Sequence, residues 1–319
     1  MSNRKPTVYL DQNVLTELRI KKIFSGDYMY VQLLKLFMSG SYSLIYSDVT
    51  LEEIYKIDNE LYIKEHLSLL KFLRAVYWNN IFIPQEHDVE SIYKIFVKSR
   101  KDKNSQNLNN SAEKFIKRMN GIDIGITTKE TFEQMLEEAV KIPFSYLKDK
   151  VPQFGKVSKP IERTVINFTR NYFSSISNEL IDFNPVEFRK CMGIDNDRLN
   201  EIEPEKVMLE IIKNFYNYDP NLINIFQLNG REIETKIEFL FLLLNWVGYY
   251  SDKFQNDSSK KGFHSASMRD AKHAGTAWHF DYLISSDFKF RKKTKACYSF
   301  IGSETQVLSI EEFLNLQKL

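Results

Sequence analysis

The stretch of sequence that decides the fold is TVYLDQN, residues 7–13, close to the first residue of the chain. It is a short apolar run rich in β-branched and aromatic side chains, which is typical of a buried parallel strand. The run ends in Asp11, and apolar residues at helical spacing follow at once. In open α/β sheets, ligands and metals bind beyond the carboxyl ends of the strands, so Asp11 lies where chemistry is expected. An Asp here is also a common helix N-cap, and both interpretations stay open.

Two further strand candidates follow in the first 85 residues. The spacing predicts helices over residues 14–23 and 30–38, interrupted near Gly26, and then a strand over residues 42–47. A long amphipathic stretch runs to residue 78, and residues 80–84 form the third strand candidate. Strands that alternate with helices in this way predict an α/β fold with a parallel sheet.

Glu53 lies at the start of the helix predicted after the second strand. Thr50 followed by Glu53 fits a capping box, in which the two side chains satisfy backbone N–H groups. A catalytic or metal-binding role for Glu53 competes with this capping role, and the local sequence does not decide between them.

The pattern changes between residues 86 and 235. Five segments there read as helices, divided by loops rich in Asn, Lys and Ser, and no fixed-period repeat is present. We therefore predict a three-layer α/β/α domain with a central parallel sheet, formed by residues 1–85 and 236–319. A large helical insertion, residues 86–235, interrupts it.

A second informative stretch lies at residues 268–281, MRDAKHAGTAWHFD. Small residues predict a helix that packs closely on the sheet, with Asp270 and His273 near its start. The apolar run at residues 282–286 predicts a strand, and it ends in Asp287. A second strand thus ends in a carboxylate, as the strand before Asp11 does. A last strand is expected at residues 306–308.

Four carboxylates would converge if these strands are neighbours: Asp11, Glu53, Asp270 and Asp287. Two unit charges about 4 Å apart repel each other by roughly 4 kcal/mol at an effective dielectric constant near 20. Hard cations relieve that repulsion, and Mg²⁺ or Mn²⁺ prefers oxygen ligands. Such ions activate water and stabilise charge on phosphodiester oxygens, so the pattern favours metal-assisted phosphodiester hydrolysis.

The composition adds limits on the kind of protein. Hydrophobic residues make up 43% and charged residues 27% of the chain, as in soluble globular proteins. Cys191 and Cys297 are too far apart in sequence to indicate a zinc site or a disulfide framework, so we expect a reducing cytoplasm. We find no secretory signal, and the most apolar window, residues 237–250, is too short to span a bilayer comfortably.

Three stretches resemble the PIN-domain nucleases: residues 9–13 (YLDQN), 270–273 (DAKH) and 282–288 (YLISSDF). The chain ending around residues 306–313 is also similar to the end of those domains. The resemblance covers about residues 6–85 and 236–319. It implies a parallel five-stranded sheet between helices and an acidic site that binds Mg²⁺ or Mn²⁺ to cleave single-stranded RNA or DNA.

The resemblance also implies roles for individual residues. The catalytic and metal-binding acids would be Asp11, Glu53, Asp270 and Asp287. Ser285 stands where the family often has Ser or Thr beside the metal-bound water, and Asn13 matches a polar position that supports the first Asp. His273 would either lie close to the metal ion or contact the substrate phosphate, or it would be a structural side chain packed beside the sheet.

The run KFRKKTK, residues 289–295, has five basic residues and no acid directly after Asp287. Surface helices often have this composition, but a helix that starts at a metal site is well placed to hold a phosphate backbone. We predict nucleic-acid contacts from Arg291, Lys292 and Lys293.

The sequence thus predicts a nuclease of single-stranded nucleic acid, RNA before DNA. An aspartyl phosphatase is disfavoured because position 13 is Asn where such enzymes usually have a second Asp, and no phosphate-binding Gly-rich motif occurs. The alternative is a catalytically inactive PIN-like scaffold that binds RNA or a protein partner. A further hypothesis is a toxin or defence effector, restrained by an inhibitor or regulator protein or by homodimerisation.

Overall fold

The structure is a computed structural model that describes residues 4–20, 28–78, 88–104, 189–190, 193–218, 233–251 and 263–316. The chain forms two compact units. Unit 1 comprises Met1–Ser99, Asp195–Asp252 and Ser265–Leu319, and unit 2 comprises Arg100–Ile194 and Lys253–His264. All predicted site residues belong to unit 1.

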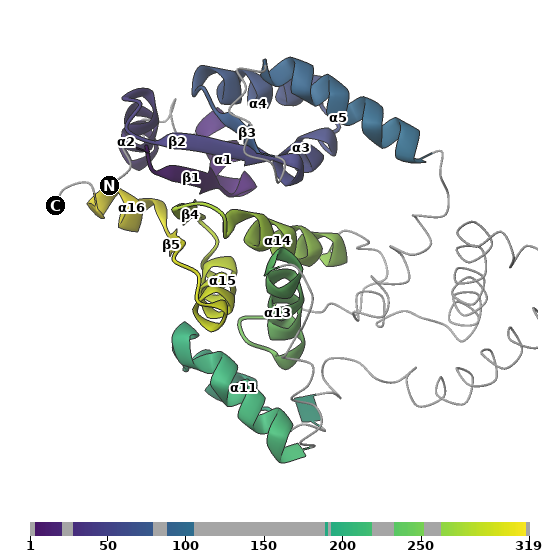
Figure 1. Ribbon diagram of the computed structural model, residues 1–319, viewed down its shortest axis with the longest axis vertical. Coiled ribbons are helices and arrows are strands. Elements are labelled where there is room, and N and C mark those ends of the chain that lie inside the picture. Colours follow the sequence, from purple (N-terminus) through teal and green to yellow (C-terminus); the bar gives the residue numbers. More distant parts are fainter. Residues whose placement is uncertain are drawn as a thin grey trace, which may run out of the picture. The chain divides into compact units, whose positions relative to one another are not determined.

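Unit 1 contains a five-stranded sheet in which all neighbouring strands are parallel. The strands are β1 (Thr7–Leu10), β2 (Ser43–Ser47), β3 (Val76–Trp78), β4 (Tyr282–Ile284) and β5 (Gln306–Leu308). Their order across the sheet is β3-β2-β1-β4-β5. β1 and β4 therefore lie side by side although most of the chain separates them (Figure 1). The α/β fold with a parallel sheet is as predicted.

Helices connect and cover the strands. They are α1 (Gln12–Ile20), α2 (Tyr28–Met38), α3 (Asp48–Tyr55), α4 (Glu60–Phe72), α5 (Val89–Asn104), α10 (Asn196–Asn200), α11 (Pro204–Tyr218), α13 (Ile233–Val247), α14 (Phe263–Ala277), α15 (Phe288–Ile301) and α16 (Ile310–Leu316). This arrangement is compatible with a three-layer α/β/α fold. No helix in the described part of the chain is long and apolar enough to cross a membrane.

Alternate residues of the central strand face opposite helical layers. Val8 and Leu10 of β1 are buried in a core with apolar side chains of α1 to α5 and α16. Tyr9, between them, contacts His273 of α14 and stacks on Phe280 with ring centroids 5.7 Å apart. Both faces of β1 are thus covered, which explains why its sequence is a continuous apolar run.

The division into units differs from the expected domain boundaries. Residues 86–99 and 195–235, which we assigned to the insertion, belong to unit 1. The described part of α5 shows the physical reason, because Val89, Ile92 and Phe96 are buried in the same core as the strands. The helices expected at residues 112–119, 131–140 and 161–173 lie outside the described residues.

Three local predictions need correction or fall outside the described residues. The amphipathic stretch expected to reach residue 78 ends earlier, because Arg74 adopts a positive φ of 50° and Val76–Trp78 forms β3. The strand expected at residues 80–84 lies outside the described residues. The capping box of α3 is made by Ser47 and Thr50, since the strand passes directly into the helix. Glu53 is therefore not a capping residue.

Candidate functional site at the ends of β1 and β4

Asp11 follows the last residue of β1 and is held by the neighbouring strand. Its backbone N–H donates to the carbonyl oxygen of Ile284 at 3.0 Å. The Ser285 hydroxyl donates to Oδ2 of Asp11 at 2.8 Å, and Nδ2 of Asn13 donates to the same oxygen at 3.3 Å. Asp11 is only 6% exposed, and its Oδ1 accepts no hydrogen bond from the described residues. Two donors thus hold Oδ2 in place, while Oδ1 has no donor among the described residues.

Asp287 lies three residues after the end of β4, at the same end of the sheet, and is exposed. Its Oδ1 accepts a hydrogen bond from the backbone N–H of Phe290 at 3.0 Å, which makes it the N-cap of α15. Its own N–H donates to the Ser285 hydroxyl at 3.0 Å. The Ser285 hydroxyl therefore connects the Asp11 carboxylate with the Asp287 backbone across two adjacent strands.

The pKa of the Asp11 carboxyl is raised above its usual value. Burial is the main cause, and the negative charges of Glu53 and Asp287 add to it. The charge of His273 and the hydrogen bond from Ser285 act in the opposite direction. Of the three acids predicted to converge with Asp11, Glu53 and Asp287 thus lie near enough for their charge to act on it, and Asp270 is not among the groups that shift its pKa.

Glu53 enters the site from α3 and is paired with two cationic side chains of α14. Its Oε2 lies 2.8 Å from Nε2 of His273, and its Oε1 lies 3.2 Å from Nε of Arg269. The contact with Arg269 is an ion pair without a hydrogen bond, because that N–H is not directed at the carboxylate. These contacts fix Glu53 at the edge of the site, where its charge is partly neutralised.

His273 is 1% exposed and forms the centre of a buried hydrogen-bonded chain. Burial by itself lowers the pKa of His273, but Tyr9, the hydrogen bond to Glu53 and the charges of Glu53 and Asp11 raise it well above its usual value. As an imidazolium, His273 donates from Nε2 to Glu53 and from Nδ1 to the Tyr9 hydroxyl, 2.8 Å away. His273 thus contacts Glu53 and Tyr9, and at 1% exposure it is too buried to contact a phosphate.

The Tyr9 hydroxyl continues this chain toward α3. It lies 3.1 Å from the Ser47 hydroxyl and 3.3 Å from that of Thr50. Since His273 donates to Tyr9, the Tyr9 hydroxyl itself donates onward to one of these two oxygens. Tyr9 and Arg269 were missed by the sequence analysis. The signal for Arg269 was its place one helical turn before His273, on the same face of α14.

The remaining predicted residues have different environments. Asp270 is half-buried on α14 next to Arg269, and its membership of the site stays a prediction. Arg291 donates to the Ser285 carbonyl oxygen at 2.7 Å, while Lys292 lies 3.6 Å from Glu203. Lys293 differs from expectation. It is 1% exposed, and the sequence signal of a basic run does not distinguish a buried lysine from exposed ones.

The reason for the burial of Lys293 is a specific partner inside unit 1. Its Nζ donates to Oδ1 of Asn245 on α13 at 2.8 Å and lies 4.6 Å from the ring centroid of Phe241. A lysine held in this way cannot reach a nucleic-acid phosphate from the surface. We therefore do not retain a phosphate contact for Lys293.

The sequence predicts a Mg²⁺ or Mn²⁺ site among these acids. Within the described residues, no group of three or more His, Cys, Asp or Glu side chains is arranged to hold a metal ion. Mg²⁺, however, keeps several waters and is often bound by only one or two carboxylates. Asp11 offers an unpaired oxygen, and the charge of Asp287 acts on it. Asp11, Asp287, Glu53 and Asp270 therefore stay predicted ligands.

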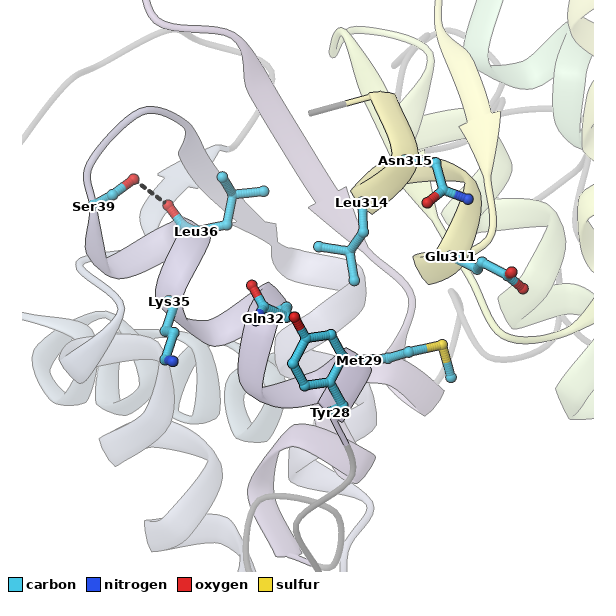
Figure 2. A pocket seen from close by; sticks show the side chains of 9 residues that line it. All are labelled: Tyr28, Met29, Gln32, Lys35, Leu36, Ser39, Glu311, Leu314 and Asn315. Carbon is cyan, nitrogen blue, oxygen red and sulfur yellow. Dashed lines mark hydrogen bonds between the residues drawn. The ribbon is translucent and has the colours of Figure 1, made fainter. Parts of the chain in front are cut away.

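Another cavity lies away from these acids. It has a volume of about 500 Å³ and is lined by residues of α2 and α16, among them Tyr28, Met29 and Leu314 (Figure 2). None of its lining residues belongs to the predicted site.

Comparisons of the chain with models of known families, with curated proteins and with solved structures found no match.

Proposed function

We propose that this protein is a Mg²⁺- or Mn²⁺-dependent nuclease of the PIN-domain type that hydrolyses phosphodiester bonds in single-stranded nucleic acid, RNA in preference to DNA. The observation that carries the proposal is the Ser285 hydroxyl, which joins Asp11 and Asp287 at the carboxyl ends of adjacent parallel strands. This edge of a parallel sheet is where α/β proteins bind their ligands. The parallel five-stranded sheet is also what the resemblance to PIN-domain nucleases implies.

In this proposal Asp11 and Asp287 hold the ion, and Glu53 and Asp270 complete the acidic surroundings. A bound Mg²⁺ or Mn²⁺ supplies an activated water and neutralises charge that develops on the phosphodiester oxygens. Ser285 and Asn13 orient Asp11 by donating to Oδ2, which leaves Oδ1 free. His273 holds Glu53 in place through the contact between Nε2 and Oε2.

The start of α15 supplies cations beside the acids. The guanidinium of Arg291 is fixed by its hydrogen bond to the Ser285 carbonyl oxygen and lies 5.9 Å from the ring centroid of Phe288. Lys292 lies 5.8 Å from the same ring and is 25% exposed. Phe288 itself is 52% exposed. An exposed aromatic ring with two cations near it suits a single strand, whose bases stack and whose phosphates are negative.

The test is cleavage of labelled single-stranded RNA and DNA by the purified protein with Mn²⁺. We expect Asp11→Asn and Asp287→Asn to lower the rate by about 100-fold or more, because each removes a charge from the ion's ligands. Glu311→Gln, which changes an exposed acid on α16, is the matched control and should cleave normally. Full activity in both Asp variants would exclude this site.

A second measurement tests the ion without any substrate. A ligand that binds only the folded state stabilises it by about 2.7 kcal/mol at a free concentration of about 100 times its Kd. Mn²⁺ should therefore raise the unfolding temperature of the wild type and of Glu311→Gln. It should have a much smaller effect on Asp11→Asn, and an equal effect on all three proteins would contradict ion binding at Asp11.

The alternative function is a nucleic-acid-binding scaffold without catalysis. The observation that favours it is the engagement of both Glu53 oxygens by His273 and Arg269. An inactive scaffold would bind single-stranded RNA but leave it intact at every Mn²⁺ concentration. It also gives no reason for acids that repel each other to stay together, which is why we favour the nuclease.

We extend the proposal to a toxin or defence effector, because a nuclease without an evident sequence-reading module requires control. Wild type and Asp11→Asn expressed in parallel should then differ in their effect on host growth. Equal growth of both hosts, at equal protein levels, would argue against toxicity while leaving the nuclease proposal in place.

A further inference from the structure

A cavity of about 330 Å³ adjoins the proposed catalytic acid Glu53. It lies among α1, α3, α4 and α14, and it shares Glu53 and Arg269 with the catalytic edge. Its volume is at the lower end of the range for small-ligand pockets, roughly 300–1,000 Å³. A single nucleotide suits this size, whereas a duplex does not.

The lining of this cavity is predominantly cationic. Its lining residues include three cations, Arg19, Lys56 and Arg269, and one acid, Glu53. Lys56 pairs with Glu52 at 2.8 Å, and its side chain is still 45% exposed. A cavity whose lining residues carry more positive than negative charge attracts anions, and the anionic groups of the proposed substrate are its backbone phosphates.

Three buried polar atoms of the lining residues make no hydrogen bond with the described residues. They are Oε1 of Gln12, Nε of Arg19 and Nε of Arg269. The Arg19 side chain is only 4% exposed, and its Nη1 forms an ion pair with Glu65. Buried polar groups are nearly always satisfied, so these atoms leave hydrogen-bonding capacity beside the cavity that no described residue uses. A nucleobase edge presents both donors and acceptors.

Tyr62 provides an aromatic wall. The Arg19 guanidinium lies over one face of its ring, 4.3 Å from the centroid, and the residue as a whole is 42% exposed. His66, beside it, has a pKa lowered mainly by burial, and its Nδ1 donates to the Tyr62 carbonyl oxygen at 2.8 Å. Its Nε2 is therefore an acceptor. Aromatic rings with adjacent cations are the usual platform for bases of single strands.

We infer that this cavity is a nucleotide subsite that holds one nucleotide of a single-stranded substrate, with its base against Tyr62 and its phosphate near Lys56 and Arg269. The inference deepens the proposed function and rests on it for the identity of the substrate. It places the bound strand across α3 and α14, with Glu53 and Arg269 between the subsite and the scissile bond.

The experiment measures binding in the full chain with the Asp11→Asn change, without divalent metal, so that cleavage plays no part. The probe is a fluorescently labelled single-stranded RNA octamer of mixed sequence, followed by anisotropy, with DNA of the same sequence in parallel. Tyr62→Leu should weaken binding about ten-fold, as expected for the loss of one stacked base. Tyr28→Leu, at a tyrosine that is 71% exposed on α2, is the control and should bind normally.

The charge contribution is tested separately. Lys56→Gln should weaken binding about two- to five-fold and reduce the slope of log Kd against log salt by about 0.7, the value for one phosphate contact on a single strand. Lys64→Gln, at an exposed lysine of α4, should do neither. Thermal unfolding of each variant checks that it is folded. RNA that contains 4-thiouridine provides a positional readout, with cross-links expected in peptides that contain residues 12–19 and 56–66.

The outcomes separate this inference from the proposed function. Weaker binding in Tyr62→Leu and Lys56→Gln, with normal controls, supports the subsite even if the wild type never cleaves RNA. A defect in Lys56→Gln alone overturns the nucleotide subsite in favour of a simple phosphate contact. Normal binding in both variants, or cross-links only elsewhere, overturns it as well, while Mn²⁺-dependent cleavage by the wild type would leave the nuclease proposal standing.

Discussion

Ser285 donates a hydrogen bond to Asp11 across 274 positions of the sequence, at a distance of 2.8 Å. The same hydroxyl accepts the backbone N–H of Asp287 at 3.0 Å. The bond is made because β1 and β4 are neighbours in the sheet, with Leu10 in register with Ile284. A neutral side chain thus holds the ends of two strands together at a point where negative charges gather.

Ser285→Ala should destabilise the protein and change its pH dependence. A hydrogen bond to a charged group contributes about 1.5–3 kcal/mol, and Asp11 loses its shorter bond in this variant. Because the bond lowers the pKa of Asp11, its removal raises that pKa further, so the acidic limb of the cleavage rate should move to higher pH. Ser286→Ala, at the exposed neighbour, should leave both properties unchanged. An acidic limb that does not move would contradict the assigned role of Ser285.

Asp11→Asn should stabilise the fold at neutral pH although it removes activity. The folded-state pKa of Asp11 is raised, so its stabilising contribution is present below the unfolded-state pKa, near 3.8, and is lost as the pH rises through the folded-state pKa. Asn carries no charge at any pH, so the variant does not lose this contribution. We expect its free energy of unfolding at pH 7 to exceed that of the wild type by about 0.5–2 kcal/mol.

Urea unfolding between about pH 4 and about pH 8 measures this difference, which should grow as the pH rises. Glu311→Gln serves as the control, since its carboxylate is exposed. A destabilised Asp11→Asn at pH 7 would mean that the hydrogen bonds to the carboxylate outweigh its burial and repulsion.

The pair of His273 and Glu53 should show strong coupling. Loss of one partner of a buried ion pair costs about 3–5 kcal/mol, so His273→Ala should be strongly destabilising. Glu53→Gln should cost less in the His273→Ala background than in the wild type, because the carboxylate has already lost its partner. A double-mutant cycle by urea unfolding gives the coupling energy.

The sign of the pH dependence of this coupling follows from the raised pKa of His273. The stabilisation is fully present below the usual His pKa, about 6.5, and is lost as the pH rises through the folded-state value. The coupling energy should therefore decrease when the cycle is repeated between about pH 6 and about pH 10. A coupling that stays constant over this range would show that His273 is neutral in the fold.

Gly275→Val should disturb the contact between α13 and α14. A Cβ at Gly275 would lie 3.0 Å from Cγ of Glu238 and 3.2 Å from the backbone oxygen of Glu234. The side chain of Glu238 can move, but the backbone of α13 cannot move without repacking. We expect a loss of about 1–3 kcal/mol in the free energy of unfolding. Ser299→Val, at an exposed position of α15, controls for the helix propensity of valine. Equal effects of both changes would exclude a steric cause.

Local signals in the sequence determined most of the elements and the two acids that end strands. The apolar runs before Asp11 and Asp287 form β1 and β4, and the apolar window at residues 237–250 and the small residues of 268–281 lie largely in α13 and α14. These signals are local because side-chain periodicity and strand composition act over a few neighbouring residues. They therefore also misjudged short elements, such as β3 and the cap of α3, where only a few residues carry the signal.

Tertiary structure decided which of these residues meet and which of them are buried. His273 lies against Glu53 across 220 positions of sequence, and Lys293 turns inward to Asn245 although its neighbours Arg291 and Lys292 are partly exposed. Neither fact is encoded in the local pattern, because burial of a charge depends on a partner that another element supplies. The sequence alone placed the acids at the ends of strands. Only the order of the strands and the packing of α3 and α14 brought Asp11, Glu53 and Asp287 within reach of one another's charge.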